Sequence, residues 1–242
     1  MTWIDDVFDT VENFTKKHGV SYRATHRQLS ASFEIGCFHG LIDFYESIGY
    51  SLALENLIDG KYRYLTTPAG NPVNFSYVTV TKDSQTFQIR QQVKIRSHTG
   101  EDIAFSPDFS VLKSEAKINA TKDPDFANGK KSFFTVSSKD VVAAHECKST
   151  SVYPELMVSF IGMLVTAHRW FDINSGSSFD PRSDDGDHLA PTLFVGALAK
   201  NLDLRMLTSL EKVYPINIIT GLHHDIHKVK LASRNRISPI MV

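Results

Sequence analysis

Two acidic residues and one lysine have the types and spacing of a metal-dependent hydrolytic site. An apolar run over 141–144 leads into Glu146-Cys147-Lys148. Alternate side chains of a strand point to opposite faces, so we expect Glu146 and Lys148 on one face and Cys147 in the core. Upstream, Pro107-Asp108 lies in a second β-rich segment, 103–112. If the two strands pair, Asp108 and Glu146 can present carboxylates to one divalent metal ion beside Lys148.

Such a group of residues suits the hydrolysis of a phosphodiester. Mg²⁺ prefers oxygen ligands and keeps several waters, so two carboxylates and a strand carbonyl can hold it while substrate phosphate completes the shell. A bound metal lowers the pKa of a coordinated water and polarises the phosphate. Lys148 can orient or help deprotonate the attacking water, or stabilise negative charge on phosphorus.

The elements that must position these residues follow from hydrophobic periodicity and from turn residues. Helices are expected at 3–17, at 30–57 with a break at Gly49, at 154–170 and at 204–212. Strands are expected at 62–65, 75–80, 87–95, 103–112 and 140–148, within 188–199, and at 216–221, with a loop at 172–188. This order predicts an α/β fold, with a mixed sheet and helices on its faces.

We expect a single domain over residues 1–242. An inserted hairpin or lobe at about 113–138 separates the two motif strands, and a basic tail occupies about 223–242. The chain has 26 Lys and Arg against 27 Asp and Glu, so only local patches could attract nucleic acid. Two cysteines, no signal-peptide pattern and no apolar run long enough for a membrane helix predict a cytoplasmic protein.

The Pro-Asp and Glu-x-Lys segments, with a helix before them and a helix and strand after them, resemble the PD-(D/E)xK nuclease superfamily over about residues 30–222. The resemblance implies a restriction-endonuclease-like mixed central sheet flanked by helices. Asp108 and Glu146 would bind Mg²⁺ or Mn²⁺, and Lys148 would be catalytic. Many members add an acid from the preceding helix, for which Glu34 is the best match; Asp43 and Glu46 are its substitutes.

The same resemblance implies a metal-dependent endonuclease that hydrolyses DNA, with a role in bacterial defence or restriction. RNA remains open as a substrate, and a homodimer is expected only from the family. The backbone of the nucleic acid would contact cationic side chains, which the sequence offers in three groups. These are Arg23, His26 and Arg27; Lys130 and Lys131; and Lys228, Lys230, Arg234 and Arg236.

Two other groups of residues compete with this interpretation. Asp125, in Lys122-Asp123-Pro124-Asp125, is a second Pro-Asp, but its neighbours are typical of a loop. We therefore favour Asp108, which lies among apolar residues. His223 and His227 have a zinc-ligand spacing without the glutamate of the metalloprotease pattern, and a solvated turn or phosphate contact is favoured there. His145 alternates onto the face of Cys147 and is interpreted as a core histidine.

Two further functional classes stay open at this stage. One is a catalytically inactive nucleic-acid-binding or structural module of the same fold, which would need no metal. The other is a zinc hydrolase built on the C-terminal histidines, whose activity would not depend on Lys148.

Overall fold

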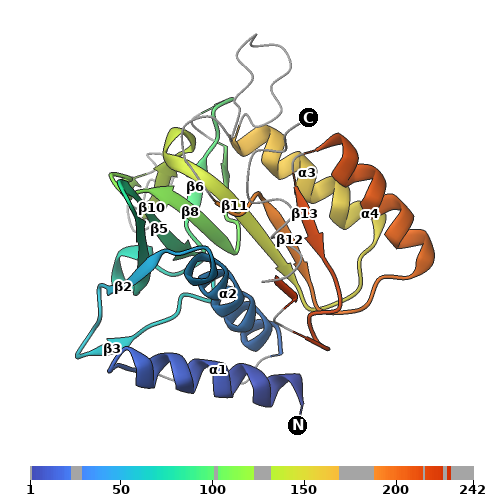
Figure 1. Cartoon of the computed structure of the whole chain (residues 1–242). Helices are drawn as coiled ribbons and strands as arrows, with labels where there is room; N and C mark the ends of the chain where they lie inside the picture. The colour runs from blue at the N-terminus through green and yellow to red at the C-terminus, as the bar shows by residue number, and fades with distance from the viewer. Residues whose placement is uncertain are drawn as a thin grey trace.

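A seven-strand mixed sheet forms the centre of the protein (Figure 1). The computed structural model describes residues 2–22, 29–100, 103–122, 132–168, 188–214, 216–225 and 228–229. The strands of the large sheet lie in the order β13 (Asn217–Ile219), β12 (Thr192–Val195), β11 (Val141–Lys148), β8 (Phe109–Lys113), β5 (Gln85–Gln91), β4 (Tyr77–Lys82) and β2 (Ser51–Glu55).

A second sheet of four strands lies beside the first, in the order β7 (Ala104–Phe105), β6 (Lys94–Arg96), β10 (Ser132–Ser137) and β9 (Asn119–Lys122). β1 (Ser21–Tyr22) and β3 (Lys61–Tyr62) form a separate parallel pair. Four α-helices complete the described fold: α1 (Trp3–Lys17), α2 (Leu29–Ser47), α3 (Pro154–His168) and α4 (Asn201–Val213). Two short 3-10 helices, η1 (Pro72–Asn74) and η2 (Ser138–Asp140), join strands. The predicted α/β class with a mixed sheet is confirmed.

The first helix, α1, has the bounds that the sequence predicted. Thr2 caps its N-terminus: the Thr2 amide donates to the Asp5 carboxylate at 2.6 Å, and the Asp5 amide donates back to the Thr2 hydroxyl at 3.4 Å. Acids in the first turn and lysines in the last turn complement the helix dipole. Gly19, at φ +64°, then turns the chain.

α2 lies between α1 and the large sheet and is buried on nearly all sides. The prediction that helix continues to about residue 57 is wrong. Gly49, with a φ of +96°, breaks the helical pattern, as expected. Residues 51–55, however, form β2, which pairs antiparallel with β4. Exposed positions alternate with less exposed ones in the first four residues of β2, a period of two that suits an edge strand.

The predicted strands 87–95 and 103–112 are each divided in two. Gln92 and Val93 separate β5 from β6, and residues 106–108 separate β7 from β8. β5 and β8 pair in the large sheet, whereas β6 and β7 pair in the small one. The chain therefore passes between the two sheets twice, once between β5 and β6 and once between β7 and β8. Strand 62–65 is also shorter than predicted, since only Lys61–Tyr62 pairs, in β3.

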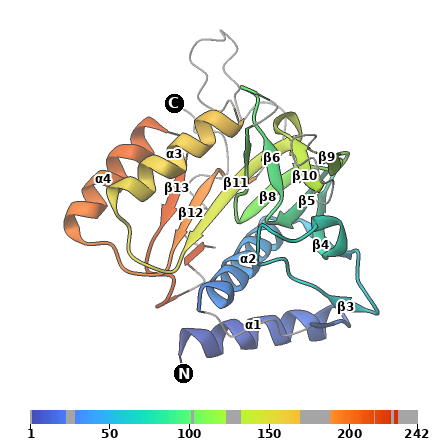
Figure 2. The same ribbon diagram turned by 180° about the vertical axis from the view of Figure 1, so that it is seen from behind.

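The insertion forms a hairpin, as predicted, but it is part of a larger unit. β9 pairs antiparallel with β10, and β10 pairs parallel with β6 (Figure 2). The segment 123–131 between them, which contains the rival Asp125, lies outside the described residues.

The C-terminal half confirms the predicted helix and strand order. β11 connects through α3 to β12, which pairs parallel with β11, and β12 connects through α4 to the parallel strand β13. α3 and α4 lie near β12 and β13, at the opposite end of the sheet from β2 (Figure 1). Most of the predicted loop 172–188 lies outside the described residues; only His188 is described, and it is buried. Among the described residues, no helix is long and apolar enough to cross a membrane.

His223, which follows β13, packs against the N-terminal helices. Its ring stacks on Trp3 with centroids 4.5 Å apart and meets the edge of Phe33 at 5.0 Å. Its backbone N–H donates to the backbone carbonyl of Gly196. The N–H of Gly196 in turn donates to the backbone carbonyl of Lys148 at 2.9 Å. A Cβ on Gly196 would lie only 2.3 Å from the His223 ring. The absence of a side chain at residue 196 therefore permits this contact.

We predict that Gly196→Ala destabilises the protein by roughly 1–3 kcal/mol, because the His223 ring cannot retreat without losing its stack on Trp3. The free energy of unfolding from urea titrations measures the effect. Gly162→Ala, in α3, is the matched control, since a Cβ there meets no atom within 4 Å. Alanine is favoured over glycine in helices, so the control should be equal to or up to about 1 kcal/mol more stable than wild type. Equal stability of the two variants would contradict the packing described.

Candidate functional site

Asp108 lies just before β8, at the point where the chain passes from the small sheet to the large one. Its Oδ2 accepts a hydrogen bond from the Cys147 N–H at 2.7 Å, so its carboxylate holds the backbone between Glu146 and Lys148. Its backbone carbonyl accepts from the Gln92 N–H at 3.0 Å. The predicted proximity of the Pro-Asp and Glu-x-Lys segments is therefore confirmed, although Asp108 precedes the strand instead of lying within it.

Gln92 belongs to the same cluster and was not predicted. Its side-chain Nε2 donates to Asp108 Oδ1 at 2.8 Å and to Glu34 Oε1 at 3.1 Å. Its φ of +52° is rare for a residue with a side chain and marks the break between β5 and β6. The alternation of apolar residues passes through residue 92 without a change of phase. The sequence therefore gave no signal for the break, nor for the role of this amide.

Glu34 comes from α2, as the sequence predicted, and is only 8% exposed. It reaches Asp108 through the amide of Gln92. Its substitute Glu46 forms an ion pair with Lys17 of α1 instead. Glu34 is thus the acid of α2 that joins the cluster through Gln92.

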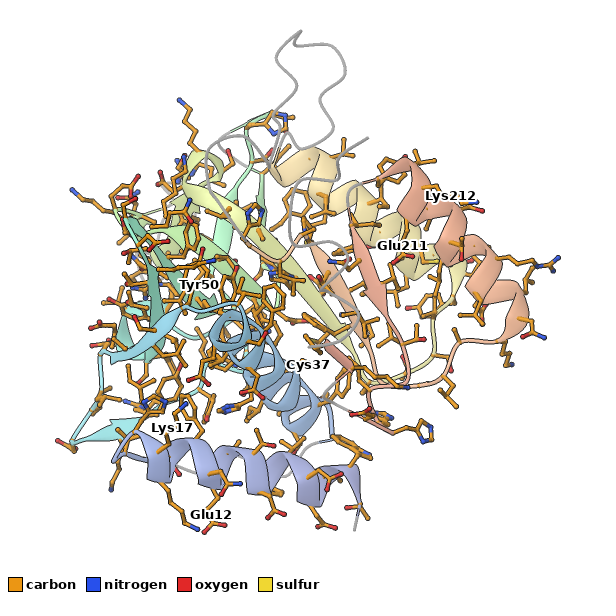
Figure 3. All side chains as sticks on the ribbon, viewed as in Figure 1. Glu12, Lys17, Cys37, Tyr50, Glu211 and Lys212 are labelled. Atoms are coloured by element: carbon orange, nitrogen blue, oxygen red, sulfur yellow. The ribbon has the colours of Figure 1, made fainter. Side chains whose placement is uncertain are left out.

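Glu146 and Lys148 project from one face of β11, as alternation predicted. The Lys148 Nζ lies 3.3 Å from Glu146 Oε2, with the lysine side chain 41% exposed and the glutamate 17%. The lysine is thus the member of the pair that faces solvent most. Cys147, between them, points into the core and is in contact with the thiol of Cys37 on α2, and both cysteines are buried. Cys37 is labelled on α2 in Figure 3.

Burial and mutual repulsion dominate the electrostatics of the cluster. Burial, and then the charge of Asp108, raises the pKa of both Glu34 and Glu146 to about 8. The close approach of the Asp108 carboxyl group raises the pKa of Glu146 further. Burial lowers the pKa of Lys148, but the charges of Glu146 and Asp108 outweigh it, and the net shift is upward.

The carboxylates fit a divalent cation in part. In the described portion of the chain, no three His, Cys, Asp or Glu side chains are close enough together to enclose a metal ion. Asp108 and Glu146, however, are close enough that the charge of Asp108 raises the pKa of Glu146, and a cation between them would offset that repulsion. Mg²⁺ commonly uses one or two carboxylates and water. Asp108 and Glu146 are therefore the residues that would hold a metal, while the Gln92 amide lies between Asp108 and Glu34.

Other predicted residues take structural roles or fall outside the description. His145 is fully buried, and its Nδ1 accepts from the Thr192 N–H at 3.1 Å, which confirms it as a core histidine. His227 lies outside the described residues, and His223 packs on aromatic rings, so the zinc hypothesis gains no support. Most of the cations proposed to contact nucleic acid also lie outside the described residues: Arg23, His26, Arg27, Lys130, Lys131, Lys230, Arg234 and Arg236.

Comparison of the chain with models of protein families, with curated proteins and with solved structures finds no match.

The raised pKa values of Glu34 and Glu146 predict that stability falls as pH rises. Unfolded carboxyls, with a pKa of 4.5, are ionised at neutral pH, whereas the folded protein holds protons up to about pH 8. The unfolded state binds fewer protons, so the free energy of unfolding should fall between pH 7 and 8.5, by on the order of 1–2 kcal/mol. His39, whose pKa burial lowers to about 3, is neutral in both states across this range and does not oppose the trend.

Urea titrations at several pH values, without divalent cations, test this expectation. Glu34→Gln and Glu146→Gln should each flatten the slope, whereas Glu155→Gln, an exposed acid of α3, should leave it unchanged. Added Mg²⁺ should raise stability more at pH 8.5 than at pH 7, because a cation replaces the lost protons. A wild-type stability that is constant or rises over this range would contradict the electrostatics described.

Proposed function

We propose that the chain is a metal-dependent endonuclease that hydrolyses DNA phosphodiester bonds. The observation that supports this most is the meeting of Asp108, just before β8, with Glu146 and Lys148 of the neighbouring strand β11 in one cluster. Two close carboxyl groups next to an ammonium group suit a site for a divalent cation and a phosphate. A role in bacterial defence or restriction belongs to the same proposal.

The topology supports a restriction-endonuclease-like core. The antiparallel strands β5, β8 and β11 are followed by the crossover helix α3 and by β12, parallel to β11. α2 precedes them and packs against β11. This is the order of helix, Pro-Asp strand, Glu-x-Lys strand, helix and strand on which the resemblance rests.

Each residue of the cluster has a role that follows from its surroundings. The raised pKa of Lys148 keeps it an ammonium at neutral pH, so it suits the binding of a phosphate oxygen and the stabilisation of developing negative charge better than proton abstraction. Asp108 and Glu146 would hold Mg²⁺ or Mn²⁺, which supplies an acidic bound water and charge neutralisation when present. Gln92 positions Asp108 by a hydrogen bond, and the same amide holds Glu34 of α2 as the third acid of the cluster.

The alternative is an inactive module of the same fold that binds nucleic acid without cleaving it. The pairing of Lys148 with Glu146 is compatible with this, since a surface ion pair needs no catalytic purpose. A homodimer, and the choice between DNA and RNA, remain predictions.

Plasmid cleavage in Mg²⁺ or Mn²⁺ tests the proposal. Asp108→Asn, Glu146→Gln and Lys148→Ala should each lower the cleavage rate by roughly 100-fold or more, because each removes a group that binds the metal or the charged phosphate. Glu155→Gln and Lys212→Ala, exposed on α3 and α4, are matched controls for the loss of one charge and should cleave as wild type does. Circular dichroism confirms that the variants fold.

Asp125→Ala separates the two Pro-Asp segments. Retained cleavage in this variant, together with loss in Asp108→Asn, is the expected result. Cleavage by wild type that survives in Asp108→Asn and is lost in Asp125→Ala would contradict the assigned site. A wild type without cleavage of DNA or RNA, and without Mg²⁺ binding by calorimetry, would favour the inactive module.

A further inference from the structure

A second site lies on the large sheet, away from the carboxylate cluster. An open pocket of about 610 Å³ is lined by residues of β4, β5 and the segments before β9 and around η1: Asn56, Val73, Tyr77, Arg90, Lys117, Ile118 and Asn119. Its volume falls in the range of small-molecule sites. Two of the lining residues are cations, and none is an acid.

Arg90 is the centre of this pocket. Its guanidinium lies 3.4 Å from the centroid of the Tyr77 ring, a stacking distance, and its Nε donates to Gln88 Oε1 at 2.7 Å. Within the described part of the chain, no carboxylate lies at ion-pair distance from it; Glu55 of β2 acts on it only at longer range. Burial lowers the pKa of Arg90. A half-buried guanidinium without an ion pair is costly, and a bound anion would offset that cost.

The rest of the lining adds donors and leaves the pocket open to solvent. Lys117 and Asn119 are exposed, on the segment that enters β9. Gln88, beside Arg90, donates from Nε2 to the carbonyl of Ser114 at 2.7 Å, which fixes the start of this segment over the sheet. The Tyr77 and Arg90 planes offer a surface on which a flat group can stack.

We propose that this pocket binds a phosphate-bearing anion, with Arg90 as the principal contact and Lys117 as the second. The phosphate can belong to a free nucleotide or to the backbone of a polynucleotide. Arg is suited to the task because its planar fork donates to two phosphate oxygens at once. The binding site does not depend on the carboxylate cluster and does not rest on the proposed nuclease activity.

The position of the pocket relative to the carboxylate cluster bears on whether the bound phosphate belongs to a polynucleotide. Arg90 pairs with Ser110 of β8, and Ser110 pairs with Ala144 of β11, so these residues share one face of the sheet. Glu146 projects from that same face two residues further along β11. Strand spacing and rise place the Cα of Arg90 about 12 Å from the Cα of Glu146. Ser110 and Ala144 between them are fully buried, so a nucleic-acid strand that contacts both sites must span a covered part of the sheet.

Two binding measurements without divalent cations, in the presence of a chelator, test the proposal and separate the sources. Calorimetry with adenosine 5′-monophosphate and with inorganic pyrophosphate probes free anions, and fluorescence anisotropy with a labelled 20-nucleotide single strand and its duplex probes the backbone. The variants are Arg90→Gln and Lys117→Gln. Lys212→Gln, on α4 at the far end of the sheet, is the control for charge (Figure 3). Thermal melts confirm folding.

We expect Arg90→Gln to weaken binding of at least one probe by roughly tenfold or more, Lys117→Gln by a smaller factor, and Lys212→Gln not at all. Binding of the free anions would identify a nucleotide site, and binding of the oligonucleotide alone would identify a backbone contact. If Arg90→Gln fails to fold, Arg90→Lys replaces it, which keeps the charge and removes the fork. Binding of no probe, or binding that Lys212→Gln weakens as much as Arg90→Gln, would overturn the proposal. None of these outcomes depends on cleavage.

Discussion

The carboxylate of Asp108 joins three segments of the chain at the place where the two sheets separate. One oxygen accepts from the backbone of β11, the other accepts from the Gln92 side chain, and the Asp108 carbonyl accepts from the Gln92 backbone. Without these bonds, polar groups at the divergence of β5 from β6 and of β7 from β8 would lack partners in a partly buried place. The separation of the sheets and the placement of Glu146 and Lys148 therefore depend on the same side chain.

This arrangement combines backbone strain with electrostatic repulsion. Gln92 has a positive φ, and burial near Asp108 raises the pKa of Glu34 and Glu146, which makes their ionisation costly. Lys148 compensates in part, with a side chain that is 41% exposed. Strained backbone and carboxyl groups with shifted pKa values both lower stability, and each is concentrated at functional sites. That coincidence supports a site for a cation or a substrate here more strongly than the sequence motif does.

Local pattern was enough to predict the elements that are continuous in both sequence and space. α1, α3, α4 and β11 have strong periodicity or apolar runs, and their order predicted the mixed sheet. The meeting of Asp108 with the Glu146 segment was expected on the condition that the two strands pair, an arrangement that the resemblance implied. What the sequence could not reveal was the division of two strands between sheets, because apolar alternation continues through Gln92 while the backbone turns. Gln92 was missed for that reason, and β2 was missed because it has only five residues and follows directly on the helical pattern of α2.

The stack of Trp3 on His223 has a consequence for how the protein is made. The first helix can dock on α2 as soon as both have left the ribosome, yet its contact with His223 must wait for nearly all the remaining chain. At a synthesis rate of roughly 5–20 residues per second, this delay lasts on the order of tens of seconds. During it, the aromatic faces of Trp3 and Phe33 are uncovered on the nascent chain. The interval between the synthesis of α2 and that of residue 223 is therefore the stage at which these aromatic faces need protection from aggregation.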